Sequence, residues 1–400
     1  MRVVILTGGS EIVAAALVEA FVKASIPIAI ISLVNKSILR KVAPDTPYGE
    51  LTWPPGSAEE AAKQLTDLLC SWGASQDEGW PILPTEDGGL RLLLEQRELV
   101  ESVGVFGRAR ALQLGGLDKA ELFGWLEQQG CTDIIAPTRV IQSIGEVREA
   151  MAELGGKCVI KPALKPLSMQ LTGMPAKAFM TADYPNSDML ERALAAAWGI
   201  AEHWVVQPHL TTPTVGEAVF WGVRDGQGGL VGMGAVERWK QPRNGGTGCW
   251  VMTRNDLTES LRPLASRILE AIDFVGLCEL PFLLDGNEEW RLLELNPRPW
   301  LQVGLAHAAG APLELMVAKV LQGQPVQPIM PRDRVAWVNL ERLLMAAWSG
   351  EQGPRWNALR DAFRVWRNAD TVAIYDSSLP HIRSRWLIRL ASKAWTRLRA

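Results

Sequence analysis

In the first thirty residues, the spacing of hydrophobic positions changes from that of a strand to that of a helix and back, which predicts the first elements of the chain. Val3 to Leu6 is a short β-branched run, and Thr7 to Ser10 has the small residues of a tight turn. Glu11 to Ala24 places apolar side chains on one helical face, and Pro27 to Ser32 is apolar again. The order of strand, turn, helix and strand predicts a doubly wound α/β domain.

Further helix and strand signals extend this domain. Ser57 and Glu60 form a capping box that predicts a helix to about Trp72. A short strand is expected at Trp80 to Leu83, and a helix at Leu90 to Leu99. The Gly-Gly-Ser turn after the first strand lacks the full G-x-G-x-x-G pattern, so a dinucleotide site is not favoured.

A second pattern lies late in the chain, where two apolar runs flank a turn. Leu277 to Leu284 and Glu289 to Leu295 both read as strands, and Asp285-Gly286-Asn287 between them predicts a hairpin. The hairpin would bring Glu279 and Glu294 together, with Asn296 on the same face as Glu294. Such an all-oxygen set suits Mg²⁺; the alternative is a sheet edge with solvated carboxylates.

Two lysines stand at element ends earlier in the chain. Lys119 follows Asp118 at the start of a predicted helix, and Lys161 ends the apolar strand Cys158 to Pro162. A lysine at a strand end is a flexible point charge suited to phosphate oxygens. A solvent-facing side chain without a functional role fits any single lysine better, but two lysines in this order beside the oxygen cluster favour a phosphate site.

Together these residues resemble the ATP-grasp superfamily, whose metal-binding end has the pattern E, a dozen or more residues, then E-x-N-x-R. Here the pattern is Glu279, Glu294, Asn296 and Arg298, and Lys119 and Lys161 resemble the two lysines that reach the nucleotide phosphates. The resemblance implies α/β and α+β architecture: a Rossmann-like preATP-grasp domain, a two-lobed ATP-grasp domain and a mostly helical C-terminal segment. The expected bounds are 1–112 for the preATP-grasp domain, 113–203 and 204–328 for the two lobes, and 329–400 for the C-terminal segment.

The resemblance also implies a ligand set. ATP and Mg²⁺ are the expected cofactors, with Mn²⁺ as an alternative ion, and Glu279, Glu294 and Asn296 are the expected metal ligands. Arg298 and Arg243 are the expected catalytic residues, Arg243 because it lies in a basic, glycine-containing stretch, residues 237–248, expected to be a loop. The expected nucleotide-binding residues are Lys119, Lys161, Ser168, Gln207, His209, Leu210 and Glu217. Residues 163–173 depart from the glycine- and serine-rich loop typical of the family.

Composition narrows the class of protein. With 400 residues, 48% hydrophobic and 21% charged, the chain is long enough for two or three globular domains. The formal net charge of −3 gives no basic footprint, so nucleic acid is not an expected partner. Five cysteines without a CxxC spacing favour reduced thiols in a cytoplasmic protein. No apolar run approaches the roughly 18 residues that a membrane span needs.

The end of the chain is amphipathic and basic. Arg385, Arg389, Lys393 and Arg397 recur every four residues and form one stripe of a predicted helix. This helix packs on its own protein, lies on an anionic membrane at the inner face, or lies on a partner.

The expected function is an ATP-dependent ligase that joins a small-molecule carboxylate to an amine, and a homodimer is compatible with it. The alternatives are an ATP-grasp phosphotransferase or carboxylase-type enzyme, and a nucleotide-binding regulatory protein without turnover.

Overall fold

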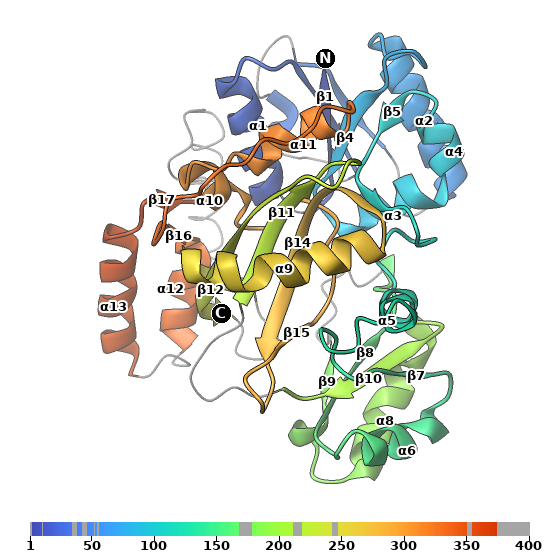
Figure 1. Ribbon diagram of the computed structural model, residues 1–400, viewed down its shortest axis with the longest axis vertical. Helices are drawn as coiled ribbons and strands as arrows, with labels where there is room; N and C mark the ends of the chain where they lie inside the picture. Colours follow the sequence, from blue (N-terminus) through green and yellow to red (C-terminus); the bar gives the residue numbers. More distant parts are fainter. Residues whose placement is uncertain are drawn as a thin grey trace, which may run out of the picture.

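A computed structural model describes residues 2–9, 11–33, 38–41, 46–51, 53, 56–167, 178–210, 218–241, 247–349 and 354–373. Three groups of strands form its framework, and the helices cover them (Figure 1). The predicted C-terminal basic helix lies outside these residues.

The first group is a parallel sheet near the N-terminus, as the sequence predicts. Its strands run in the order β3-β2-β1-β4-β5, and every pairing between them is parallel. The elements are β1 (Val3–Thr7), α1 (Glu11–Lys23), β2 (Ile28–Ser32), η1 (Ile38–Lys41), β3 (Tyr48–Glu50), α2 (Ala58–Ser71), β4 (Trp80–Pro84), α3 (Asp87–Glu95), α4 (Arg97–Val100) and β5 (Gly104–Val105). The Ser57 side chain accepts a hydrogen bond from the Glu60 N–H at 3.0 Å, as expected of a helix cap.

The helix predicted at Leu90 to Leu99 is wrong at both ends. Helix α3 already begins at Asp87, and it ends at Glu95 before the separate short helix α4. The Gly88-Gly89 pair disfavours a helix by propensity, but α3 packs on the sheet here, with Gly89 against Leu6 and Pro84. Packing therefore decides where this helix starts.

The second group is a small antiparallel sheet in the lobe at the lower right of Figure 1, with strand order β7-β10-β8-β9. Its elements are α5 (Lys119–Gln128), β7 (Arg139–Ile141), η2 (Ile144–Glu146), α6 (Val147–Glu153), β8 (Cys158–Pro162), β9 (Phe179–Met180), η3 (Thr181–Asp183), α8 (Ser187–Ala197), η4 (Trp198–Ile200) and β10 (Trp204–Pro208). Cys158, Ile160, Trp204 and Val206 lie on one face and form its core. The opposite face therefore carries Lys161.

The third group is the large central sheet, in the order β15-β14-β11-β12-β13-β16-β17, with β6 paired to β14. Its elements are β6 (Arg108–Ala109), β11 (Ala218–Arg224), β12 (Leu230–Gln241), β13 (Thr247–Thr253), α9 (Asn255–Ala271), β14 (Phe274–Leu284), β15 (Trp290–Leu292), β16 (Ala336–Val338) and β17 (Thr371–Val372). Helix α9 lies across this sheet (Figure 1). A Cβ on Gly234 of β12 would come within 2.6 Å of the α9 backbone at Leu257 and Thr258, so glycine is needed for this close approach.

Two strand predictions are corrected here. The stretch 237–248, expected to be a loop, is largely strand: β12 continues to Gln241 and β13 begins at Thr247, while 242–246 lie outside the described residues. Charged residues interrupt the apolar alternation there, and the β12–β13 register is irregular around Trp239. The second hairpin strand, expected to reach Leu295, is only Trp290–Leu292, so Glu294 follows the strand.

The N-terminal sheet and the central sheet share one hydrophobic core. Helices α10 (Val303–Ala308) and α11 (Leu313–Val320) pack against α1, and their apolar residues cluster with those of β11 and β12. The segment after residue 328 adds β16 and β17 to the central sheet, with α12 (Leu340–Ser349) and α13 (Arg355–Arg367) packed on each other. Within the described ranges, no helix is long and apolar enough to cross a bilayer.

Candidate functional site

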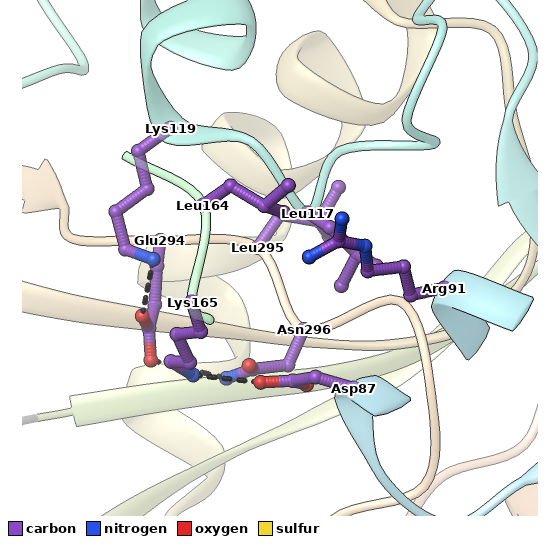
Figure 2. A pocket seen from close by; sticks show the side chains of 9 residues that line it. All are labelled: Asp87, Arg91, Leu117, Lys119, Leu164, Lys165, Glu294, Leu295 and Asn296. Atoms are coloured by element: carbon purple, nitrogen blue, oxygen red, sulfur yellow. Dashed lines mark hydrogen bonds and ion pairs between the residues drawn. The ribbon is translucent and has the colours of Figure 1, made fainter. Parts of the chain in front are cut away.

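Lys119 is the first residue of α5, and the helix start fixes its position. The Asp118 side chain caps the helix by accepting hydrogen bonds from the Ala120 and Glu121 N–H groups at 2.7 and 3.2 Å. The Lys119 backbone N–H donates to the Ala163 carbonyl at 3.0 Å, next to the end of β8. Its side chain is buried, and Nζ lies 3.6 Å from Glu294 Oε2 (Figure 2).

Lys161 reaches the same place from β8. It is paired with Val205 of β10, on the face opposite the small-lobe core. Its Nζ donates to the Leu293 carbonyl at 3.3 Å, one residue before Glu294. Both lysines predicted from the sequence therefore lie against the segment that carries Glu294.

Glu279, Glu294 and Asn296 also converge. Glu279 and Asn296 form a short antiparallel bridge, with backbone N–H···O distances of 2.9 Å in both directions. The Asn296 Nδ2 group lies 3.0 Å from Glu279 Oε2 and 3.4 Å from Glu294 Oε1. The indole N–H of Trp221 donates to Glu279 Oε1 at 3.1 Å and holds this carboxylate from the other side.

This donor set fits a hard divalent cation. Two carboxylates lie on either side of one amide group, and Mg²⁺ prefers oxygen ligands and retains several waters. Among the described residues there is no group of three or more His, Cys, Asp or Glu side chains arranged for a metal. A magnesium ion here would rely on Glu279 and Glu294, with water and phosphate completing its shell; for Asn296 to join them its amide would have to turn, because its nitrogen faces both carboxylates and its oxygen accepts from Arg298.

Asp87, which the sequence analysis did not single out, joins the site from the N-terminal domain. It lies at the start of α3, and its carboxylate accepts a hydrogen bond from Lys165 Nζ at 2.9 Å (Figure 2). The same carboxylate accepts a hydrogen bond from Arg298 Nε. Arg298 also donates to Asn296 Oδ1 at 3.3 Å. A signal for Asp87 was present: it follows the carboxyl end of a parallel strand, where α/β folds place ligand-binding residues.

Arg91, one turn after Asp87 on α3, lines the same small pocket, as does Leu117 before α5 (Figure 2). Sequence reasoning did not mark either residue. The pocket is thus built from the N-terminal domain, the small lobe and the end of the hairpin.

The charged side chains around this pocket shift one another's pKa values. Burial, together with the nearby Lys119 ammonium, lowers the pKa of Lys161 to about 8. Burial favours the neutral form of Glu294, but Lys165, Lys119 and Lys161 outweigh it and lower the pKa of this carboxyl to about 2. Burial raises the pKa of Glu279 above its usual value. Arg298 and Lys165 overcome the burial of Asp87 and hold the pKa of its carboxyl well below the usual range.

This balance suits an anionic ligand. Around these carboxylates, Lys119, Lys161, Lys165 and Arg298 supply positive charge in a partly desolvated place, where charge-assisted bonds to phosphate or carboxylate are strong.

The Gly-rich turn after β1 has a different partner. The Gly9 N–H donates to Glu86 Oε2 at 2.8 Å, and a Cβ on Gly8 would collide with this carboxylate. A carboxylate therefore occupies the turn that would approach a pyrophosphate in a dinucleotide fold.

The remaining predicted site residues lie at the end of β10 or outside the residues that the structure describes. Gln207 is on the same sheet face as Lys161, and its Nε2 donates to Thr138 Oγ1 at 2.8 Å. The His209 N–H donates to the Lys157 carbonyl at 2.8 Å, and Leu210 is half-buried beside it. Ser168, Glu217 and Arg243 lie outside the described residues.

Comparisons with known proteins show what the chain is similar to. Residues 140–329 match the family model described as the carbamoyl-phosphate synthase L chain, ATP-binding domain. The carbamoyl phosphate synthase large chain of Methanospirillum hungatei is 33% identical over 78 residues, which span 19% of this chain and 7% of that one.

Solved structures extend the likeness over most of the chain. N5-carboxyaminoimidazole synthetase from Staphylococcus aureus in complex with ADP has a TM-score of 0.64 at 13% identity, covering 88% of this chain and 86% of that one. Biotin carboxylase from Campylobacter jejuni has a TM-score of 0.61 at 15% identity, covering 81% and 72%. The family model covers less than half of the chain, and the solved structures show that the chain shares the fold of these proteins, so the chain resembles the ATP-grasp superfamily.

Proposed function

We propose that this chain is an ATP-dependent ligase that activates a carboxylate as an acyl phosphate and couples it to an amine. One observation carries the proposal. Lys119 and Lys161 of the small lobe contact Glu294 and the neighbouring Leu293 carbonyl, and the side chains of Glu294 and Glu279 both lie beside Asn296. Cations and carboxylates placed in this way suit a metal-bound triphosphate. The fold shared with nucleotide-bound relatives supports the same conclusion.

The nucleotide would lie between the two lobes. Lys119 and Lys161 would hold its phosphates, and the end of β10 at Gln207, His209 and Leu210 would pair with adenine; Ser168 and Glu217 remain proposed contacts. Glu279, Glu294 and Asn296 would hold Mg²⁺, or Mn²⁺ in its place. When bound, the metal supplies neutralisation of charge on the phosphate oxygens.

The chemistry would proceed in two balanced steps. An oxygen of the substrate carboxylate attacks the γ-phosphorus, the bond to the bridging oxygen breaks, and ADP leaves. The amine nitrogen then attacks the acyl carbon, phosphate leaves, and the amine loses a proton. Arg298, with Lys165 beside it, would orient the carboxylate and stabilise the charge of the acyl phosphate, and Arg243 is proposed to assist.

A second candidate function differs only in the molecule that accepts the γ-phosphoryl group. The matched structures include proteins described as N5-carboxyaminoimidazole synthetase and biotin carboxylase. In a carboxylase-type reaction, bicarbonate would take the place of the organic carboxylate in the first step. The same cations would hold either anion, so the site geometry is compatible with both.

The experiment that tests the proposal is ADP release with MgATP across panels of carboxylates and amines, and with bicarbonate. The ligase predicts turnover only when both an acid and an amine are present. Turnover that requires bicarbonate and an acceptor would select the carboxylase, and tight ATP binding without turnover would select the regulatory alternative. Absence of ATP binding would contradict all three.

A matched pair of variants controls this assay. Glu294→Gln removes a charge at the proposed metal site, whereas Glu289→Gln removes a charge from an exposed residue of the same hairpin. The proposal expects turnover to be lost in the first variant and retained in the second. We further propose small-molecule substrates, a cytoplasmic location and a homodimer as working assignments; gel filtration with light scattering tests the last.

A further inference from the structure

A second cavity lies away from the charged cluster, between α1, α10 and the end of β17. Its volume is about 490 Å³, within the roughly 300–1,000 Å³ typical of small-molecule pockets. Small residues, among them Ala16, Gly304 and Ala308, form part of its wall, and Trp337 adds a flat apolar surface. Within the described residues it shares no lining residue with the pocket of Figure 2.

The cavity contains a buried carboxylate with one unsatisfied oxygen. Glu314 is only 1% exposed, and its Oε1 lies 2.6 Å from Nδ1 of His307. Its Oε2 is buried without a hydrogen-bond partner. A buried acceptor left unpaired costs about 1–3 kcal/mol, so a donor supplied by a ligand would be favoured at this atom.

The other charged residues around the cavity include both acidic and basic side chains. Lys23 pairs with Glu19 at 2.6 Å, and Asp370 accepts a hydrogen bond from the Ala336 N–H at 2.7 Å. Lys23 is already paired with Glu19, and Glu314 and Asp370 add negative charge, which disfavours a strongly anionic ligand such as a nucleotide. The charged residues lining the cavity are Glu19, Lys23, His307, Glu314, Arg332 and Asp370.

A cation lines the same cavity as the unsatisfied carboxylate oxygen. The Arg332 guanidinium donates to the carbonyl of Ala308, and the neighbouring residue, His307, is the partner of Glu314. A ligand that carries both an ammonium and a carboxylate would find a partner for each of its charges in this cavity. Arg332 is exposed, so its guanidinium remains open to such a carboxylate.

We propose that this cavity binds a free amino acid, with its ammonium at Glu314 Oε2 and its carboxylate at Arg332. The site is distinct from the proposed nucleotide site, and the inference does not depend on the proposed ligase activity. Its position is suited to an effector, because α10 begins three residues after Trp300. Trp300 stacks on Trp221 with ring centroids 5.0 Å apart, and Trp221 donates to Glu279.

Binding is tested by calorimetry and thermal shift on the full chain. The probes are glycine, L-alanine, L-glutamate and L-lysine, each beside its N-acetyl derivative, which lacks the ammonium. At least one amino acid should bind saturably, and its N-acetyl form should bind at least about tenfold more weakly. Failure of all four to bind at up to about 10 mM would overturn the inference.

Three variants locate the binding. Glu314→Gln removes the charge, and Ala16→Phe fills the cavity from a partly exposed position without altering Glu314. Each should weaken binding at least about tenfold, and the second keeps the test valid if the buried Glu314 variant fails to fold. Glu294→Gln, at the proposed metal site, should leave amino acid affinity unchanged. Unchanged affinity in folded Ala16→Phe would contradict the assignment to this cavity.

Discussion

Asp87 and Arg298, 211 residues apart in the sequence, form an ion pair that is largely shielded from solvent. The pair joins the N-terminal domain to the segment that follows the hairpin, and Lys165 of the small lobe contacts the same carboxylate. Three parts of the chain therefore meet at Asp87. The contact therefore ties the N-terminal domain to the small lobe and to the segment after the hairpin.

Replacing Asp87 should destabilise the protein. Asp87→Asn leaves Arg298 and Lys165 without their counterion, and removing one member of a buried pair costs about 3–5 kcal/mol. Urea denaturation should show a loss of this size in the free energy of unfolding. Asp77→Asn, at an exposed site in the same domain, should change it by less than about 0.5 kcal/mol. Equal effects of the two substitutions would show that the ion pair contributes nothing.

The same carboxylate predicts an acid dependence. Because its two cations hold the pKa of Asp87 well below the unfolded value of about 3.9, its contribution to stability is present above that value. The contribution is lost as the pH falls through the folded pKa. The stability difference between wild type and Asp87→Asn should therefore be constant near neutrality and narrow below about pH 4. A difference that stays constant down to pH 3 would contradict this sign.

The phosphate role of Lys161 predicts a loss of nucleotide affinity on substitution. Lys161→Met should weaken ADP binding by about 1.5–3 kcal/mol, or roughly 10- to 150-fold in Kd, because it removes a charge-assisted bond. Calorimetry with ADP measures the change. Lys157→Met, at an exposed lysine just before the same strand, is the matched control and should bind as wild type does. Equal affinities of the two variants would remove Lys161 from the site.

The contact between α9 and the central sheet predicts a packing effect. A Cβ at Gly234 would lie 2.6 Å from backbone atoms of Leu257 and Thr258, so Gly234→Ala should destabilise the fold by about 1–3 kcal/mol. At Gly286, in the hairpin turn, a Cβ would meet nothing within 4 Å. Thermal unfolding should therefore separate Gly234→Ala from Gly286→Ala. Equal melting temperatures would mean that the helix and sheet adjust without cost.

Local patterns in the sequence were sufficient for much of the fold and part of the site. The hairpin around Asp285, the helix cap at Asp118 and the strand that carries Lys161 all depend on neighbouring residues, and the structure contains each of them. The prediction that the lysines and the carboxylates on these elements lie together came from the family resemblance. Whether Lys119, Lys161, Glu279, Glu294 and Asn296 bind nucleotide and metal remains a prediction.

What could not be predicted depends on packing between distant segments. The pairing of Asp87 with Arg298 requires the N-terminal sheet to lie against the hairpin, and no local pattern encodes that arrangement. The continuation of β12 beyond Glu237 and its pairing with β13 were missed because charged residues replace the apolar alternation where the two strands pair irregularly. In both cases tertiary context outweighs local propensity.

The most direct test of the central claim is electron paramagnetic resonance of Mn²⁺ with ADP. The account expects Glu279, Glu294 and Asn296 to bind the metal, and Lys119 and Lys161 to bind the phosphates of the nucleotide. A protein-bound Mn²⁺ signal should therefore appear only when ADP is present. The signal should be lost in Glu294→Gln and kept in Glu289→Gln. A nucleotide-dependent signal that survives unchanged in Glu294→Gln would contradict the account.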